Sequence, residues 1–192
     1  MASPTPMGPN DRPSFEGRWA TMPLEIPDPD YDDPKEVYAF FGLAAYGAQI
    51  LEQELVLLAS VLHMGAAGSL TGEWVNALMD RIEAKTFGSI LHEARALMTV
   101  PDDLDGLLAE ALRERNRLIH RFFAAHATDF LSRAGRREMI DELRAAIALF
   151  SAADEAATAI RRPLAESLGI DPRVAQALYD EAIVDASSRD AG

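Results

Sequence analysis

The chain has 192 residues, of which 48% are hydrophobic, so it is long enough for one domain with a sizeable core. Its 31 acidic residues outnumber 18 basic ones, and the net charge of −13 argues against broad electrostatic binding of nucleic acid. The absence of cysteine excludes a disulfide framework and cysteine-based zinc or redox sites.

Residues 1–33 are predicted to form an irregular segment laid against the domain. Eight of the eleven prolines lie within the first 34 residues, together with a cluster of aspartates. This composition is typical of segments that do not pack as regular elements. Apolar side chains at Trp19, Met22, Leu24 and Ile26 could hold part of the segment in a groove.

Neither secretion nor membrane insertion is predicted. The residues after Met1 are polar and rich in proline, unlike the apolar core of a signal peptide. The richest apolar run, from Val37 to Leu62, is interrupted by glutamines and glutamates in its middle. A soluble cytoplasmic protein is therefore expected.

From residue 34 onward, the hydrophobic pattern predicts about five or six helices in one bundle. Apolar residues recur at the three- and four-residue spacing of amphipathic helices, and no stretch shows the alternation of a β-strand. The predicted helices cover about residues 34–64, 71–84, 88–98, 102–127, 135–162 and 172–184. We expect an all-α bundle as a single domain over residues 34–185, with a flexible tail over 186–192.

Capping residues and helix breakers set the expected helix ends. Asp33-Pro34-Lys35-Glu36 combines an acidic N-cap, a proline in the first turn and a following glutamate. The helix over 135–162 is expected to stop at Pro163, because proline lacks the N–H that continues a helix. Gly169, followed by Asp171 and Pro172, predicts a C-cap and then a new helix start.

Arg115, Asn116 and His120 are the residues best suited to chemistry. On a helical wheel, the helix over 102–127 has a broad apolar face. That face consists of Leu104, Leu107, Leu108, Ala111, Leu112, Leu118, Ile119 and Phe122. Arg115 falls near its middle, whereas Asn116 and His120, four residues apart, share its flank. A guanidinium among leucines is costly unless a group pairs with it, because it cannot lose its proton.

Purely structural roles for these residues remain open. Arg115 could form an ion pair with Glu52 or Glu54 on the first helix, and His120 could be bonded to a backbone carbonyl at the edge of the core. The ion pair is compatible with catalysis, because a carboxylate behind Arg115 would fix the guanidinium. We therefore expect Arg115 to be held by a carboxylate or aimed at a second copy of its helix, with His120 at the rim.

A basic stretch surrounds this segment. Between Arg113 and Arg144, eight arginines against five acids leave a net charge of +3 within an acidic chain. Arg113, Arg117 and Arg121 are spaced by four residues and predict a basic ridge on one side of the helix. The ridge is either a solvated helix face or a surface that holds RNA phosphates.

The R-N-x-x-x-H segment resembles the signature of the HEPN (higher-eukaryote and prokaryote nucleotide-binding) domains, which are small helical bundles. Arg115 and His120 match the Arg-x4-His form, and Asn116 matches the polar residue that follows the arginine. The phenylalanine pair after the histidine matches the apolar context of the family. Thr86-Phe87-Gly88 also resembles a feature of some members, so the resemblance covers about residues 35–160.

The resemblance implies a metal-independent endoribonuclease, often a toxin or defence effector, that needs no cofactor and acts as a C2 homodimer with both motifs at one cleft. RNA supplies its own nucleophile, the 2′-hydroxyl. His120 would move protons near neutral pH, and Arg115 would stabilise the phosphate charge. Asn116 would orient the imidazole or hold a phosphate oxygen. An antitoxin that modifies a tyrosine two residues after the histidine is not expected, because Phe122 stands there.

Other functions rest on weaker patterns. A non-catalytic module of the same fold would use the three motif residues for dimerisation or to bind a nucleotide or partner protein. A helical enzyme of another class is a third interpretation. No metal site is predicted, because His63, His92 and His126 form no i, i+4 pair. The only glycine-rich stretch, residues 65–68, lacks the lysine of a phosphate-binding loop.

Overall fold

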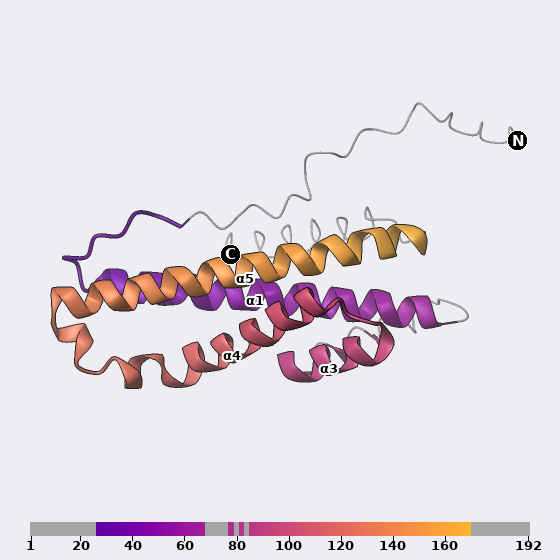
Figure 1. Cartoon of the computed structure of the whole chain (residues 1–192), viewed down its shortest axis with the longest axis horizontal. Coiled ribbons are helices and arrows are strands. Elements are labelled where there is room, and N and C mark those ends of the chain that lie inside the picture. The colour runs from indigo at the N-terminus through magenta and orange to yellow at the C-terminus, as the bar shows by residue number, and fades with distance from the viewer. Residues whose placement is uncertain (1–25, 68–76, 79–80, 83–84, 170–192) are drawn as a thin grey trace, which may run out of the picture.

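A computed structural model describes residues 26–67, 77–78, 81–82 and 85–169 (Figure 1). Within these ranges the chain forms four α-helices and no β-strand. They are α1 (Lys35–Ala66), α3 (Phe87–Leu97), α4 (Asp102–Ala125) and α5 (Arg133–Ser167), with the short 3-10 helix η1 (Asp129–Leu131) before α5. The all-α prediction is confirmed, but the described ranges hold four α-helices and not the expected five or six.

Several sequence predictions concern residues beyond these ranges. The helix predicted over 172–184, the tail over 186–192 and residues 1–25 of the N-terminal segment lie outside the described part of the chain. Of the helix predicted over 71–84, the structure describes residues 77, 78, 81 and 82. These four are helical, and Leu78 and Ile82 are buried in the core.

Helix α1 is long and amphipathic, as the sequence predicts. Its buried apolar side chains recur every three or four residues, from Val37 to Leu62. The Asp33 side chain accepts a hydrogen bond of 2.9 Å from the backbone N–H of Lys35, but the N-cap residue of α1 is Pro34 and not the predicted Asp33. None of the described helices combines the length and apolar character needed to cross a membrane.

Helices α1 and α5 run in the same direction along the length of the bundle (Figure 1). Near their first turns, Arg133 Nε lies 2.6 Å from Asp32 Oδ1. Near their last turns, Leu168 packs so closely on Gly65 that a Cβ at residue 65 would lie 3.4 Å from its side chain. Helices α1 and α5 therefore form the central pair on which the bundle is built.

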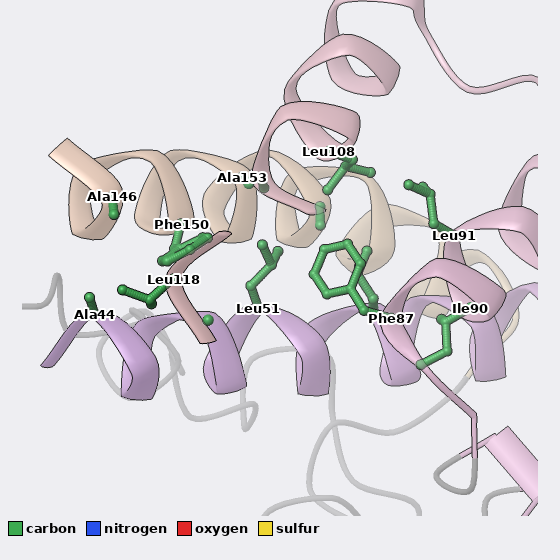
Figure 2. Packing of buried hydrophobic residues seen from close by; sticks show 14 of the residues in the cluster. Ala44, Leu51, Phe87, Ile90, Leu91, Leu108, Leu118, Ala146, Phe150 and Ala153 are labelled. Carbon is green, nitrogen blue, oxygen red and sulfur yellow. The ribbon is translucent and has the colours of Figure 1, made fainter. Parts of the chain in front are cut away.

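Helix α4 runs in the opposite direction across this pair, and α3 covers the end near the start of α4 (Figure 1). In the core, Leu118 of α4 lies against Phe150 of α5, and Phe87 of α3 lies near Leu51 of α1 (Figure 2). All four of these side chains are buried. The core thus fixes one face of α4 and leaves the other to solvent.

Helix α5 continues through Pro163 to Ser167, so the predicted stop at this proline was wrong. The missing N–H and the ring of proline weaken the helix at Ala159, but contacts on both sides of the proline compensate. Arg161 is held by Glu54 of α1, and Leu164 packs against the core. The helix ends where the sequence places a C-cap, at a glycine with φ of 67° whose N–H donates to Glu166 O at 3.0 Å.

Residues 26–33 are irregular, as predicted, and are held against α5. The hydroxyl of Tyr31 donates to Asp141 Oδ1 at 3.2 Å, and the guanidinium of Arg137 lies over the Tyr31 ring. Ile26 packs against the core. This part of the N-terminal segment therefore acts as a strap across the start of α5.

Candidate functional site

Arg115 lies on the inner seam of α4, but its guanidinium reaches the surface. The other residues of that seam are buried: Leu104, Leu108, Ala111, Leu118 and Phe122. The Arg115 side chain is 30% exposed, and its Nη2 lies 3.6 Å from Glu52 Oε2 on α1. The long aliphatic stem fills the seam while the charged group stays near water. The expected carboxylate partner is therefore present.

Asn116 and His120 lie on the exposed flank of α4. Arg115 Nη1 donates a hydrogen bond of 3.3 Å to Asn116 Oδ1, which links the first two motif residues. Within the described part of the chain, His120 makes no hydrogen bond or ion pair. The alternative in which a backbone carbonyl holds the imidazole is thus not formed there, and the ring is free to meet a ligand.

Glu54, the other acid considered for Arg115, faces a different helix. Its buried carboxylate accepts two hydrogen bonds from Arg161 of α5, from Nε at 2.5 Å and from Nη2 at 3.0 Å. Two residues along a helix turn the side chain by about 200°, so Glu52 and Glu54 cannot serve the same partner. Of the two predicted acids, Glu52 contacts Arg115 and Glu54 does not.

The predicted basic ridge is not uniform. Arg117 binds Glu114 through Nε at 2.8 Å and Nη2 at 2.7 Å, and its Nη1 lies 2.9 Å from Glu142. The hydrogen bonds that Arg117 donates to Glu114 are the main reason that the pKa of Arg117 is raised. Arg113 and Arg121 are exposed and form no ion pair with the described residues. Two of the three ridge arginines are thus available to a phosphate.

A surface cavity of about 410 Å³ lies between α4 and α5, on the side of Arg117. Its charged lining residues are Glu110, Arg113, Glu114, Arg117 and Glu142. With three carboxylates and two guanidiniums, this cavity does not favour a polyanion. Neither Asn116 nor His120 lines it, so the motif is a surface site on the other flank of α4.

His126 is a buried polar residue to which the sequence analysis gave no role. Its Nδ1 lies 2.8 Å from Asp129 Oδ2, and its Nε2 lies 3.2 Å from Glu142 Oε2. The ring also packs against Phe122. These contacts join the end of α4 to η1 and α5, and the His-x-x-Asp spacing was the available signal.

Two further charged groups have shifted pKa values. Burial, and then the charge of Glu54, raise the pKa of Asp154 to about 6, although Arg161 opposes this. Glu93 is partly buried, which favours its neutral form, but hydrogen bonds with Lys85 and His63 prevail and lower its pKa. Both groups lie away from the motif, so they bear on stability and not on its chemistry.

Metal ligands and known relatives give no further guide. Among the described residues, no three histidine, aspartate or glutamate side chains are grouped so as to hold a metal ion. Comparisons with protein-family models, curated proteins and solved structures find no match. The interpretation of the site therefore rests on its residues and their geometry.

Proposed function

We propose that the chain is a metal-independent endoribonuclease of HEPN type that acts as a homodimer, in the role of a toxin or defence effector. The observation that carries the proposal is that the Arg115 guanidinium leaves the inner seam of α4 and reaches the surface next to Asn116, on the exposed flank that also carries His120. A motif closed into the core could not meet a substrate. Here His120 is exposed, and the carboxylate of Glu52 contacts the guanidinium of Arg115.

The proposed reaction is an attack of the RNA 2′-hydroxyl on the adjacent phosphate. The 2′-oxygen forms a bond to phosphorus as the bond to the 5′-oxygen breaks, which leaves a 2′,3′-cyclic phosphate and a free 5′-hydroxyl. A proton leaves the 2′-hydroxyl and another reaches the 5′-oxygen, and His120 is suited to move them near neutral pH. Arg115 stabilises the extra phosphate charge, and Asn116 holds a phosphate oxygen.

A homodimer would supply the second proton-transfer group that one chain lacks. The side chain of Ile119, 45% exposed, stands between Arg115 and His120 and gives the motif an apolar contact for a second α4. Two copies related by a twofold axis would place both histidines at one cleft. A partner protein that inhibits the enzyme would have to cover this surface, because Phe122 is buried and lacks a hydroxyl for modification.

The proposal is tested by incubating the purified chain with RNA in EDTA. We expect products that end in 2′,3′-cyclic phosphate, and no cleavage of DNA or of 2′-O-methyl RNA. Arg115→Ala and His120→Ala should abolish cleavage, whereas His92→Ala removes an exposed histidine on α3 and should not. Equal degradation by the wild type and all three variants would identify a contaminant and overturn the proposal.

A non-catalytic module of the same fold is the second candidate. One observation favours it: carboxylates already contact Arg115 and Arg117, which reduces the positive charge that a phosphate would meet. Such a module would form the dimer or bind a nucleotide without cutting RNA. Binding of RNA with no cyclic-phosphate product in the same assay would support it.

A further inference from the structure

Two exposed aromatic rings stand beside the motif, at the end of the bundle where α1 begins and α4 ends (Figure 1). Tyr38 lies in the first turn of α1 and Phe123 in the last turn of α4, and their side chains are 56% and 39% exposed. The ring centroids are 5.7 Å apart, with planes inclined by 34°. Single exposed apolar residues are ordinary on a surface, whereas two exposed rings in contact offer a larger continuous apolar face than either ring alone.

The two rings are held in place by others beneath them. The ring centroid of Phe130 lies 5.3 Å from that of Tyr38. The ring centroid of Phe123 lies 4.9 Å from that of Phe41 and 5.3 Å from that of the buried Phe122. Because packing fixes the rings before any ligand arrives, little conformational entropy would be lost on binding.

The rings continue the surface that carries the motif. Phe123 follows His120 by three residues, so the two side chains are neighbours on α4, about 4.5 Å apart along the helix axis. Gly42 follows Tyr38 by one turn of α1, and a Cβ there would meet nothing within 4 Å. The space beside Gly42, one turn along α1 from Tyr38, is therefore open.

Three acidic residues near this end of the bundle are already engaged, whereas Glu36 in the first turn of α1 forms no ion pair with the described residues. Asp33 accepts a hydrogen bond from the backbone of Lys35, Asp32 pairs with Arg133, and Asp129 binds His126. The exposed imidazole of His120 lies on the open side of α4. A negatively charged strand can thus approach the rings along this side despite the acidic charge of the whole chain.

We propose that Tyr38 and Phe123 form a stacking platform for an unpaired base of single-stranded RNA, next to the bond that is cleaved. The inference rests on the proposed function and adds part of its substrate specificity. Ring faces stack on any base, so the platform selects unpaired over duplex RNA with little preference for sequence. A base on Phe123 directs its ribose and phosphate toward His120, one turn away.

The test measures binding of a fluorescent 2′-O-methyl oligouridylate, which cannot be cleaved by attack of a 2′-hydroxyl. Tyr38→Leu and Phe123→Leu remove a ring but keep an apolar side chain, and each should weaken the affinity about tenfold. An abasic strand of the same length should bind the wild type and both variants equally. Tyr46→Leu is the matched control, because Tyr46 is 55% exposed on α1 and makes no ring contact with Tyr38 or Phe123.

Unchanged affinity of both variants, or an equal loss in Tyr46→Leu, would overturn the platform, as would failure of the wild type to bind the strand. Light scattering tests whether the rings instead contact a second copy of the chain. If Tyr38→Leu loses a dimer but keeps its affinity for the strand, the rings belong to a subunit contact. If the wild type cleaves RNA but the ring substitutions do not change the affinity for the strand, the stacking platform is wrong and the proposed nuclease activity stands. If binding of the strand depends on the rings but the wild type does not cleave RNA, the proposed nuclease activity is wrong and the stacking platform stands.

Discussion

At the scale of single residues, the contact between Glu52 and Arg115 decides how the guanidinium is presented. The two charged groups are 3.6 Å apart and partly exposed, so their attraction adds little to stability. Its consequence is orientation, because the side chain of Arg115 leaves the seam of α4 toward this carboxylate and toward Asn116. Glu52 is therefore a positioning residue for the proposed reaction.

Glu52→Gln should lower kcat for RNA cleavage by about 10- to 100-fold, because a displaced guanidinium no longer meets the transition-state charge. KM and Tm should change little, since the contact is weak in energy. Asp105→Asn removes a comparably exposed partner, that of Arg95, away from the motif and should leave kcat unchanged. An equal fall of kcat in both variants would contradict the positioning role.

Asp154→Asn should stabilise the fold above about pH 6. Because burial raises the pKa of Asp154 from 3.8 to about 6, the folded chain holds an extra proton between these values and loses stability as the pH rises through them. At pH 7.5 the variant should gain roughly 1–3 kcal/mol in the free energy of unfolding, and at pH 4 almost none. Urea denaturation at both pH values measures this.

The control for this experiment is Glu138→Gln, which alters an exposed acid on α5 and should change stability little at either pH. The same gain for Asp154→Asn at pH 4 and pH 7.5 would contradict the proposed cause. Glu93 acts in the opposite sense, since its lowered pKa costs stability as the medium becomes acidic. Only the difference between variant and wild type therefore isolates Asp154.

Residue spacing could reveal some of these relations and not others. The wheel placed Arg115 on the seam and His120 at the rim, because positions along one helix follow from its periodicity. It could not choose between Glu52 and Glu54, because that depends on which side of α1 faces α4. It also treated Arg113, Arg117 and Arg121 alike, whereas Glu142, 25 residues along the chain from Arg117, engages only that arginine among the three.

At the scale of elements, the turn from η1 into α5 depends on a close approach of two backbones. An added Cβ on Gly135 would lie 2.2 Å from the carbonyl oxygen of Asp129, which no side chain tolerates without a shift of the backbone. Ser132 completes the turn, because its hydroxyl accepts the N–H of Gly135 at 3.0 Å. The close contact joins η1 to the first turn of α5.

Gly135→Ala should destabilise the chain by about 1–3 kcal/mol, although alanine is the better helix former. Gly106→Ala is the matched variant, because a Cβ on that helical glycine of α4 meets nothing within 4 Å. It should gain about 0.5–1 kcal/mol. Thermal unfolding of both variants decides the matter, and a gain in Gly135→Ala would contradict the close approach.

Element boundaries were predictable where local chemistry fixes them. Asp33 is such a short-range signal, and α1 begins within two residues of it. Gly169 has the positive φ of a C-cap, but α5 ends at Ser167 and not at the predicted Pro163. The predicted stop at Pro163 was wrong because the helix around this proline is held by packing on α1, and a local sequence pattern does not show such packing. Long-range packing thus overrode a local rule.

At the scale of the whole molecule, one side of α4 packs against the core and the other carries the residues of the proposed site. The exposed side joins the motif, Ile119 and the ring pair in one surface, while the charged lining of the cavity between α4 and α5 consists of three carboxylates and two guanidiniums. An acidic chain with a local, partly neutralised basic segment would bind RNA weakly. We therefore expect its RNA affinity to fall only modestly with added salt, because few phosphates are contacted.

The most direct measurement is the initial rate of RNA cleavage in EDTA by the wild type, His120→Ala and His92→Ala, each purified by the same steps. The account predicts that His120→Ala is at least about 100-fold slower than the wild type, while His92→Ala is as fast. Rates that agree within about twofold across all three proteins would contradict the claim that this surface of α4 cleaves RNA.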